Sequence, residues 1–224
     1  QTAGGQNSGY SVASAGDING DGIDDLVIGA PGAEPGGQFI AGSSYVVFGT
    51  ALGLPAQLDL SNLNGVNGFR IDGAAGGDQS GTIVAPAGDI NGDGIDDLII
   101  GASRASANGV GTSGSTFVLF GRTGAWGATF ALSALDGTNG FRLDGVAGDD
   151  ASGEGAASAG DVNGDGFDDL IIGARGADPG GLASAGSAYV VFGKASGWSA
   201  AVSLSALNGA NGFRLDGAQT MDLT

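Results

Sequence analysis

The chain has 224 residues, of which 48 are glycine, and it carries a formal net charge of −17 with no cysteine and no histidine. This composition excludes disulfides, thiolate or imidazole catalysis and most transition-metal sites, and the scarcity of Lys and Arg argues against a nucleic-acid partner. No apolar run is long enough to insert into a membrane, and glycine interrupts every candidate helix, so short β-strands are expected.

The predicted elements recur with a period of 72 residues. The acidic segment DINGDGIDD begins at Asp17, returns at Asp89, and appears as DVNGDGFDD at Asp161. The VVFG-type and GFR-type segments keep the same spacing. We therefore predict three repeat units, at 1–72, 73–144 and 145–216, while 217–224 begin a further repeat or close the array as an overlap.

Each unit predicts four strands, and in the first unit the earliest of them is Tyr10–Gly16. The others are the DLVIGA, YVVFG and FRIDG segments that follow the acidic loop. In FRIDG, Phe69 and Ile71 are expected to face a core, whereas Arg70 and Asp72 face water. Four-stranded sheets repeated in tandem are typical of propeller blades. We therefore predict an all-β fold of three four-stranded antiparallel β-propeller blades.

The acidic segment supplies an oxygen ligand at every second residue, a spacing that lets a short loop wrap one hard cation such as Ca²⁺. Positions 1, 3, 5 and 9 are Asp, Asn, Asp and Asp, and position 7 offers its backbone carbonyl. Glycines at positions 4 and 6 permit the positive φ that such a wrap requires. The candidate metal ligands are Asp17, Asn19, Asp21, Ile23 and Asp25 in the first unit, Asp89, Asn91, Asp93, Ile95 and Asp97 in the second, and Asp161, Asn163, Asp165, Phe167 and Asp169 in the third.

Two other interpretations of the acidic loop compete with this one. An EF-hand or dockerin loop needs an acidic residue at position 12 inside a helix, but this position is isoleucine within a predicted strand: Ile28, Ile100 and Ile172. Solvated hairpin turns built on NG and DG pairs remain possible, although carboxylates crowded into one turn repel each other unless a cation lies among them. The extra acid at position 8 is interpreted as an outward-facing residue at the start of a strand: Asp24, Asp96 and Asp168.

The combination of VVFG, IGAP at Ile28–Pro31 and DxNGDGxDD resembles the FG-GAP repeat, found in integrin α-chain propellers and in many bacterial surface and secreted proteins. The resemblance covers all three units. One departure is that IGAP becomes IGAS in the second unit and IGAR in the third. The resemblance implies that the five candidate positions of each loop bind one Ca²⁺ per blade.

The leading functional hypothesis is a non-catalytic, calcium-stabilised propeller segment for adhesion or protein interaction in an extracellular or cell-surface setting. Alternatives are an accessory domain of a larger secreted enzyme, or a carbohydrate-binding propeller. In the latter, Trp126 and Trp198 would stack on sugars, although packing at the edge of strands three and four is favoured for both. Since closed propellers have four to eight blades, we expect either self-association into a six-bladed ring or further blades in a longer chain. The sequence does not identify a protein or glycan ligand.

Overall fold

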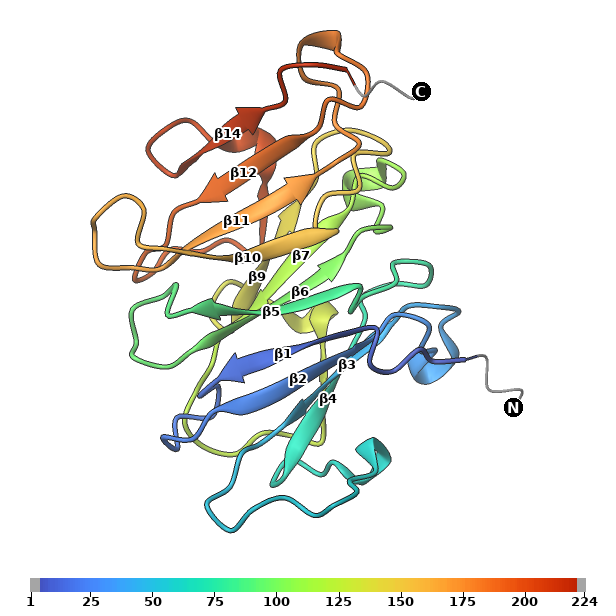
Figure 1. Cartoon of the computed structure of the whole chain (residues 1–224), viewed down its shortest axis with the longest axis vertical. Helices are drawn as coiled ribbons and strands as arrows, with labels where there is room; N and C mark the ends of the chain where they lie inside the picture. Colours follow the sequence, from blue (N-terminus) through green and yellow to red (C-terminus); the bar gives the residue numbers. More distant parts are fainter. Residues whose placement is uncertain (1–4, 221–224) are drawn as a thin grey trace.

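The computed structural model describes residues 5–220, which form β-strands, short 3₁₀ turns and loops. Three sheets follow one another along the chain (Figure 1). The first contains β1 (Ser11–Gly16), β2 (Asp25–Ala30), β3 (Ser43–Val47) and β4 (Gly68–Asp72). The second contains β5 (Ile83–Gly88), β6 (Asp97–Ala102), β7 (Ser115–Leu119) and β9 (Gly140–Asp144). The third contains β10 (Gly155–Gly160), β11 (Asp169–Ala174), β12 (Ser187–Val191) and β14 (Gly212–Asp216). These strands confirm the predicted all-β, blade-like repeats.

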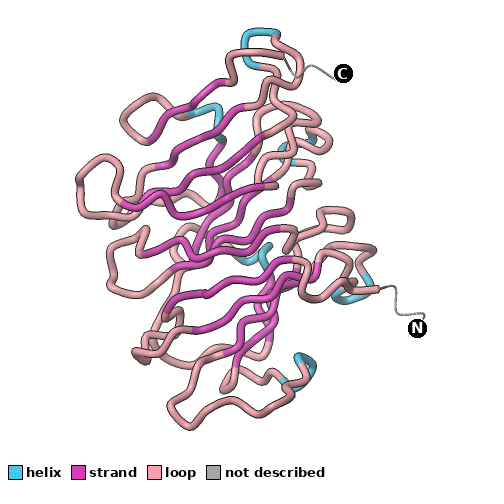
Figure 2. The backbone as a smooth tube through the Cα atoms, in the orientation of Figure 1, coloured by secondary structure: helices cyan, strands magenta, loops and turns pink. Residues whose placement is uncertain are grey.

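Three-residue 3₁₀ turns interrupt the loops between strands, as Figure 2 shows. They are η1 (Pro35–Gly37), η2 (Leu60–Asn62), η3 (Ala107–Gly109), η4 (Leu132–Ala134), η5 (Pro179–Gly181) and η6 (Leu204–Ala206). Within residues 5–220, no helix has the length and apolar character needed to cross a membrane. The predicted overlap at 217–224 is described only as far as residue 220, and 221–224 lie outside the described residues.

The first two sheets each have a fifth strand that the sequence analysis did not predict. β8 (Thr129–Ala131) belongs to the second repeat but pairs in parallel with β4 of the first sheet, placing Phe130 opposite Ile71. β13 (Ala201–Ser203) pairs with β9 in the same way, one repeat later. The four-stranded prediction therefore holds only for the third sheet, and each of these outer strands ties a sheet to the following repeat.

The innermost strands of the three sheets lie side by side, with β5 between β1 and β10 (Figure 1). Hydrophobic side chains fill the two interfaces between neighbouring sheets, which we call seams. Phe69 and Ile71 are fully buried in the first seam, as predicted, and Phe141 and Leu143 occupy the same places in the second. Burial of one such side chain stabilises the fold by about 1.5–3 kcal/mol, so the seams are a principal source of stability.

Candidate metal centre

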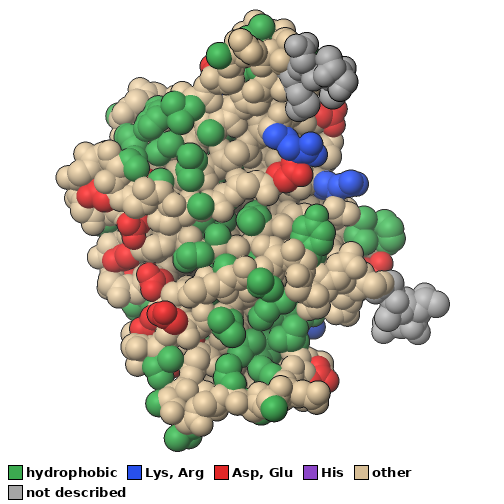
Figure 3. Space-filling model, viewed as in Figure 1, with side chains coloured by type: hydrophobic (Ala, Val, Ile, Leu, Met, Phe, Trp, Pro, Cys, Tyr) green, Lys and Arg blue, Asp and Glu red, His purple; other side chains and the backbone are tan. Residues whose placement is uncertain are grey.

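The three acidic loops connect the two innermost strands of each sheet, at 17–24, 89–96 and 161–168. The strand before each loop ends with a shift in register, at Gly16 in the first sheet, where φ is +64°. Acidic side chains gather along the edge of the molecule where these loops lie (Figure 3). The sheet stacking therefore places the three loops along one edge, each next to another.

The aspartate at position 1 folds over its own loop. Asp17 Oδ1 accepts a hydrogen bond from the N–H of Asp21 at 2.9 Å, and Oδ2 accepts one from the N–H of Gly22 at 2.7 Å. Gly20 and Gly22 have φ of +71° and +86°, the left-handed conformation predicted for them. Asp89 and Asp161 accept the same two bonds in their loops.

The aspartate at position 9 ties the loop to the end of the third strand. Asp25 is fully buried, and its Oδ1 accepts a hydrogen bond from the N–H of Gly49 at 2.8 Å. A Cβ on Gly49 would collide with the carbonyl oxygen of Asp24, which explains the glycine after Phe48. The bond recurs from Gly121 to Asp97 and from Gly193 to Asp169.

The carboxyl groups at position 9 are poorly suited to carry a charge without a cation. Burial, reinforced by the nearby carboxylates of Asp21 and Asp17, raises the pKa of Asp25 to about 6. In the second loop, burial together with two neighbouring carboxylates raises the pKa of Asp97 to about 8. Loss of water and like-charge repulsion both disfavour the ionised form, and a bound divalent cation would reverse both effects.

The first loop also holds two buried oxygens without a hydrogen-bond partner, Asn19 Oδ1 and Asp25 Oδ2. Leaving a buried polar atom unsatisfied is costly, and a hard cation is the kind of partner these oxygens match. In the other two loops, the equivalent of Asp25 Oδ2 accepts a hydrogen bond from a backbone N–H, at 3.1 Å from Ile90 and 3.0 Å from Val162.

The predicted ligands of each loop are near one another but are not gathered around one point. Across residues 5–220, no group of three acidic side chains is close enough to hold a metal ion as it stands. Asp17 and Asp21 direct their oxygens at loop N–H groups instead. The carboxylate, amide and carbonyl oxygens of the loop are the ligands that a hard cation prefers. To bind one ion, Asp17 and Asp21 would have to release their hydrogen bonds to the loop N–H groups.

The acid at position 8 has a role that the sequence analysis missed. Asp96 Oδ2 accepts a hydrogen bond from the N–H of Asp17 at 2.9 Å, and Asp168 Oδ2 accepts one from the N–H of Asp89 at 2.9 Å. The interpretation of both as outward-facing was therefore wrong, because each faces the acidic loop of the preceding repeat. Asp24, the corresponding acid of the first repeat, is exposed.

The side chain at position 7 covers the preceding loop. A Cβ on Gly20 would lie 3.4 Å from Ile95 Cδ1, and a Cβ on Gly92 would collide with the ring of Phe167. The sequence predicted a role only for the backbone carbonyl of position 7, as a metal ligand. The side chain at position 7 also packs against the glycine at position 4 of the preceding acidic loop.

Each of the two tryptophans packs on a phenylalanine at the outer end of one seam. Trp126 stacks on Phe69 with ring centroids 4.3 Å apart, and Trp198 stacks on Phe141 at 4.0 Å. The guanidinium of Arg122 lies over the ring of Trp126, 4.5 Å from the ring centroid, and Lys194 Nζ lies 4.6 Å from the ring centroid of Trp198. Edge packing was predicted correctly, but the phenylalanine belongs to the preceding repeat. Each ring thus contacts a phenylalanine and a cationic side chain, and the sugar-stacking alternative stays a prediction.

Comparison with known proteins identifies the repeat. The model of the FG-GAP repeat matches residues 8–47, 80–119 and 155–191. Phosphatidylinositol-glycan-specific phospholipase D of Mus musculus is 37% identical over 111 residues, covering 49% of this chain and 12% of that protein. The protein of the same name from Homo sapiens is 33% identical over 181 residues, covering 77% of this chain and 19% of that protein. Integrin alpha-PS5 of Drosophila melanogaster is 32% identical over 174 residues, covering 78% of this chain and 15% of that protein.

The chain thus spans less than a fifth of the length of these relatives. Each matched segment contains the three inner strands of one sheet and the acidic loop between the first two. Together the segments make up more than half of the sequence. The fold, the spacing and the matched segments agree, and the chain belongs to the FG-GAP repeat family.

Proposed function

We propose that this chain is a calcium-binding β-propeller segment that acts outside the cell in adhesion or protein interaction and has no catalytic activity of its own. The observation that carries the calcium assignment is in the first loop, where Asn19 Oδ1 is buried without a hydrogen-bond partner and the buried carboxyl of Asp25 lies near those of Asp21 and Asp17. The raised pKa of Asp25 supports the same assignment, because a cation would offset the cost of ionising this buried carboxyl.

Each ion would be bound by the oxygens at positions 1, 3, 5, 7 and 9 of a loop, and its role would be structural. Each loop joins the two innermost strands of a sheet, so an ion held there would link the ends of these two strands. An ion that binds only the folded state stabilises it by mass action, by about 2.7 kcal/mol when calcium is 100 times its Kd.

The expected calcium affinity supports the extracellular location, and the similarity to an integrin supports the role in protein interaction. Calcium sites of extracellular modules are filled at about 10⁻⁴–10⁻³ M, which suits a site assembled from one short loop. The three FG-GAP repeats of this chain and its similarity to Integrin alpha-PS5 support a propeller that binds other proteins. The sequence contains no His or Cys for nucleophilic or imidazole catalysis, and the acidic residues of the loops recur once per repeat as ligands would.

Isothermal titration of chelator-treated protein with calcium chloride tests the proposal. We expect three ions per chain and a higher melting temperature, with magnesium chloride as the control because Mg²⁺ demands a stricter octahedral geometry. The absence of binding heat and of a melting shift at millimolar calcium would refute the assignment.

The second candidate is an accessory domain of a larger secreted enzyme. It is favoured by the similarity to the phosphatidylinositol-glycan-specific phospholipases D, each several times longer than the matched region. The complete reading frame that encodes this chain tests it. A catalytic domain in the same polypeptide supports this candidate, and a frame holding only further repeats contradicts it.

A further inference from the structure

A cavity of about 590 Å³ lies between the loop before β5, the loop between β6 and β7, and the turn η4. Phe117 and Leu132 form part of its apolar lining, and Arg104 and Arg142 contribute guanidinium groups. All the residues that line it fall within 74–201, so the second repeat and its two neighbours bound it completely. We call it the β7 cavity, after the strand that carries Phe117.

A similar cavity of about 610 Å³ lies at the corresponding place in the first repeat. The side chains that the two cavities share are 72 residues apart: Tyr45 and Phe117, Leu60 and Leu132, and Arg70 and Arg142. The repeat therefore builds the cavity itself, and any function specific to one cavity depends on the positions at which the repeats differ.

The second repeat departs from the other two at three positions that line the β7 cavity. Arg104 replaces a glycine, Ser106 replaces an acid, and Phe117 replaces a tyrosine. The counterparts in the first and third repeats are Gly32 and Gly176, Glu34 and Asp178, and Tyr45 and Tyr189. Together the three changes add a positive charge, remove a negative charge and remove a phenol hydroxyl at one cavity.

The loop that carries Arg104 and Ser106 keeps the backbone conformation of its counterparts. The turns η1, η3 and η5 stand at the same place in the three loops, and the middle residue of each is left-handed. Its φ is +61° at Gly36, +53° at Asn108 and +62° at Gly180. The second repeat thus changes the side chains of this loop without changing its course, so the fold does not account for the changes.

Arg104 carries a charge that the protein leaves uncompensated. Within residues 5–220, it neither makes an ion pair nor lies over an aromatic ring, unlike each of the other Lys and Arg side chains. Arg104 is also exposed. In a chain with a formal net charge of −17, this guanidinium is available to an anionic ligand.

Arg142 is oriented by a neighbouring aspartate of its own strand. Its Nε donates to Asp144 Oδ1 at 2.5 Å, and its Nη2 donates to Asp144 Oδ2 at 2.9 Å. Asp144 is buried and also accepts hydrogen bonds from Ser115 and Asn108. A guanidinium has five N–H donors, and these two bonds use only two of them, so Arg142 can still donate to a ligand.

The carboxyl of Asp78 also lines the β7 cavity. Asp78 is buried and accepts a hydrogen bond of 3.1 Å from the N–H of Ala75, and burial raises its pKa while the charge of Arg142 opposes the rise. The acidic loop 89–96 lies at the other end of β6 (Figure 1). A six-residue strand spans about 20 Å, which exceeds the Debye length of about 8 Å in physiological salt, so that loop does not repel an anion here.

We propose that the β7 cavity binds an acidic segment of a partner protein, whose Asp or Glu carboxylate pairs with Arg104 while a neighbouring apolar side chain enters the apolar lining. The planar guanidinium matches a carboxylate in geometry and charge. A protein segment is favoured over an acidic sugar because Phe117 removes a hydroxyl from the lining, which suits an apolar group. This inference rests on the protein-interaction part of the proposed function and names the chemistry of the partner.

A titration followed by nuclear magnetic resonance tests the site on isotope-labelled protein in calcium-containing buffer. The probe is a capped pentapeptide with a central Glu between two Leu residues, and the matched probe has Gln in place of Glu. We expect the Glu peptide to shift the amide signals of 75–78 and 104–107 with a Kd below about 1 mM, and the Gln peptide to bind at least about tenfold more weakly. No shift in these signals, or equal binding of the two peptides, would overturn the proposal.

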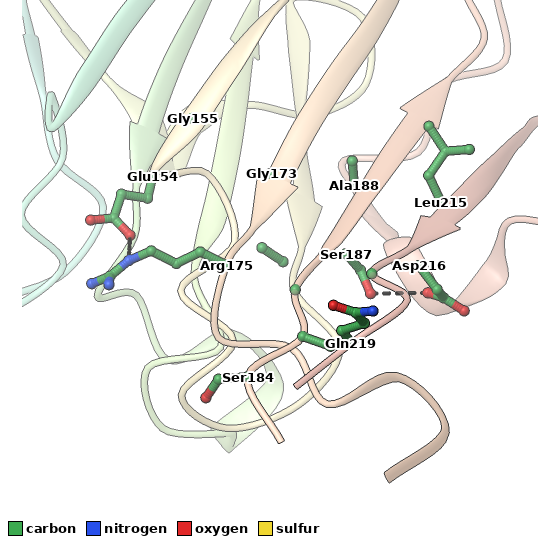
Figure 4. Close-up of a pocket in the computed structure, with 14 residues that line it drawn as sticks. Glu154, Gly155, Gly173, Arg175, Ser184, Ser187, Ala188, Leu215, Asp216 and Gln219 are labelled. Carbon is green, nitrogen blue, oxygen red and sulfur yellow. Dashed lines mark hydrogen bonds and ion pairs between the residues drawn. The ribbon is translucent and has the colours of Figure 1, made fainter. Parts of the chain in front are cut away.

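Two variants restore the residue types that the other repeats carry on the same backbone, so both should fold. Arg104→Gly and Ser106→Asp should each weaken binding of the Glu peptide by at least about tenfold. Arg175→Ser is the matched control, because it removes the same charge from a side chain that is paired with Glu154 and lies outside the β7 cavity (Figure 4). Native affinity in either cavity variant, or an equal loss in the control, would contradict the site.

Two competitors test the class of ligand. If inorganic phosphate displaced the Glu peptide at equal concentration, the site would not be specific for carboxylates, and if a glucuronic acid disaccharide bound more tightly than the peptide, the partner class would be wrong. Binding of calcium without binding of the Glu peptide would overturn this site and leave the calcium assignment intact. Binding of the peptide without calcium binding would do the reverse.

Discussion

The carboxylate of Asp96 accepts a hydrogen bond of 2.9 Å from the backbone N–H of Asp17, across the seam between the first and second sheets. The bond joins the last part of one acidic loop to the first residue of another. Asp168 and Asp89 repeat it across the second seam. Each of the first two candidate metal loops is therefore held in place by the repeat that follows, and loop geometry is coupled to the packing of the sheets.

Removing this bond should destabilise the fold through the seam. Asp96→Ala leaves the N–H of Asp17 without its carboxylate acceptor, and we expect a loss of about 1–2 kcal/mol in the free energy of unfolding by urea. Asp96→Asn keeps an oxygen acceptor and should lose less. Equal losses for the two variants would show that the hydrogen bond does not contribute.

Gly92 should tolerate no side chain, for two separable reasons. Its φ of +73° strains any other residue, and a Cβ would also collide with the ring of Phe167. Gly92→Ala should therefore cost more than Gly94→Ala, which has φ of +84° and open space around the Cβ position. We expect about 1 kcal/mol for the control, from backbone strain alone, and about 2–4 kcal/mol for Gly92→Ala, measured by urea unfolding. Similar losses would mean that Phe167 moves aside without cost.

Calcium removal should lower stability only where the loops are intact. The triple variant Asp21→Ala, Asp93→Ala and Asp165→Ala deletes the position 5 carboxylate from each loop. In calorimetry, chelation should lower the melting temperature of the native chain by several degrees and leave that of the triple variant almost unchanged. If chelation lowered the melting temperature of both proteins equally, the calcium-dependent stability would not come from these loops.

The calcium-free protein should become less stable as the pH rises, in part because of Asp78 and Asp150. Both carboxyls are buried and accept a hydrogen bond from the N–H of Ala75 or Ala147, and burial raises both pKa values. A raised pKa means that the folded state keeps a proton that the unfolded chain has lost. Their contribution to stability is therefore complete below the ordinary pKa and is lost as the pH rises through the raised one.

Replacing both residues by asparagine keeps an oxygen acceptor and removes the titration. Urea unfolding in chelator should then show a smaller decline in stability from about pH 4 to about pH 7. Asp136→Asn is a control of opposite sign, because hydrogen bonds from Thr138 lower the pKa of that exposed carboxyl. An unchanged pH profile in the double asparagine variant would contradict the prediction.

The sequence predicted the features that each repeat determines by itself. The acidic loops, the alternation of Phe69 and Ile71 with Arg70 and Asp72, and the four principal strands follow from local pattern and from the 72-residue period. These features depend on turn chemistry and on which face of a strand is apolar, and both can be read within a few residues.

The missed features all join one repeat to another. β8 and β13 are three residues long and pair with the preceding sheet, so no local alternation marks them. The inward orientation of Asp96 and Asp168 depends on where the neighbouring loop lies. One signal was available: the acid at position 8 recurs in every unit, more regularly than a solvated strand-entry residue needs to.

β8 and β13 belong to one repeat but complete the sheet of the preceding one. A boundary drawn between two repeats therefore removes a strand from one of the sheets. A recombination event that adds or deletes 72 residues nevertheless keeps the register in which one repeat meets the next. In the first two sheets, the outer edge is matched by a strand from the next copy of the unit. Genes of this type can therefore gain or lose blades without evolving a new interface.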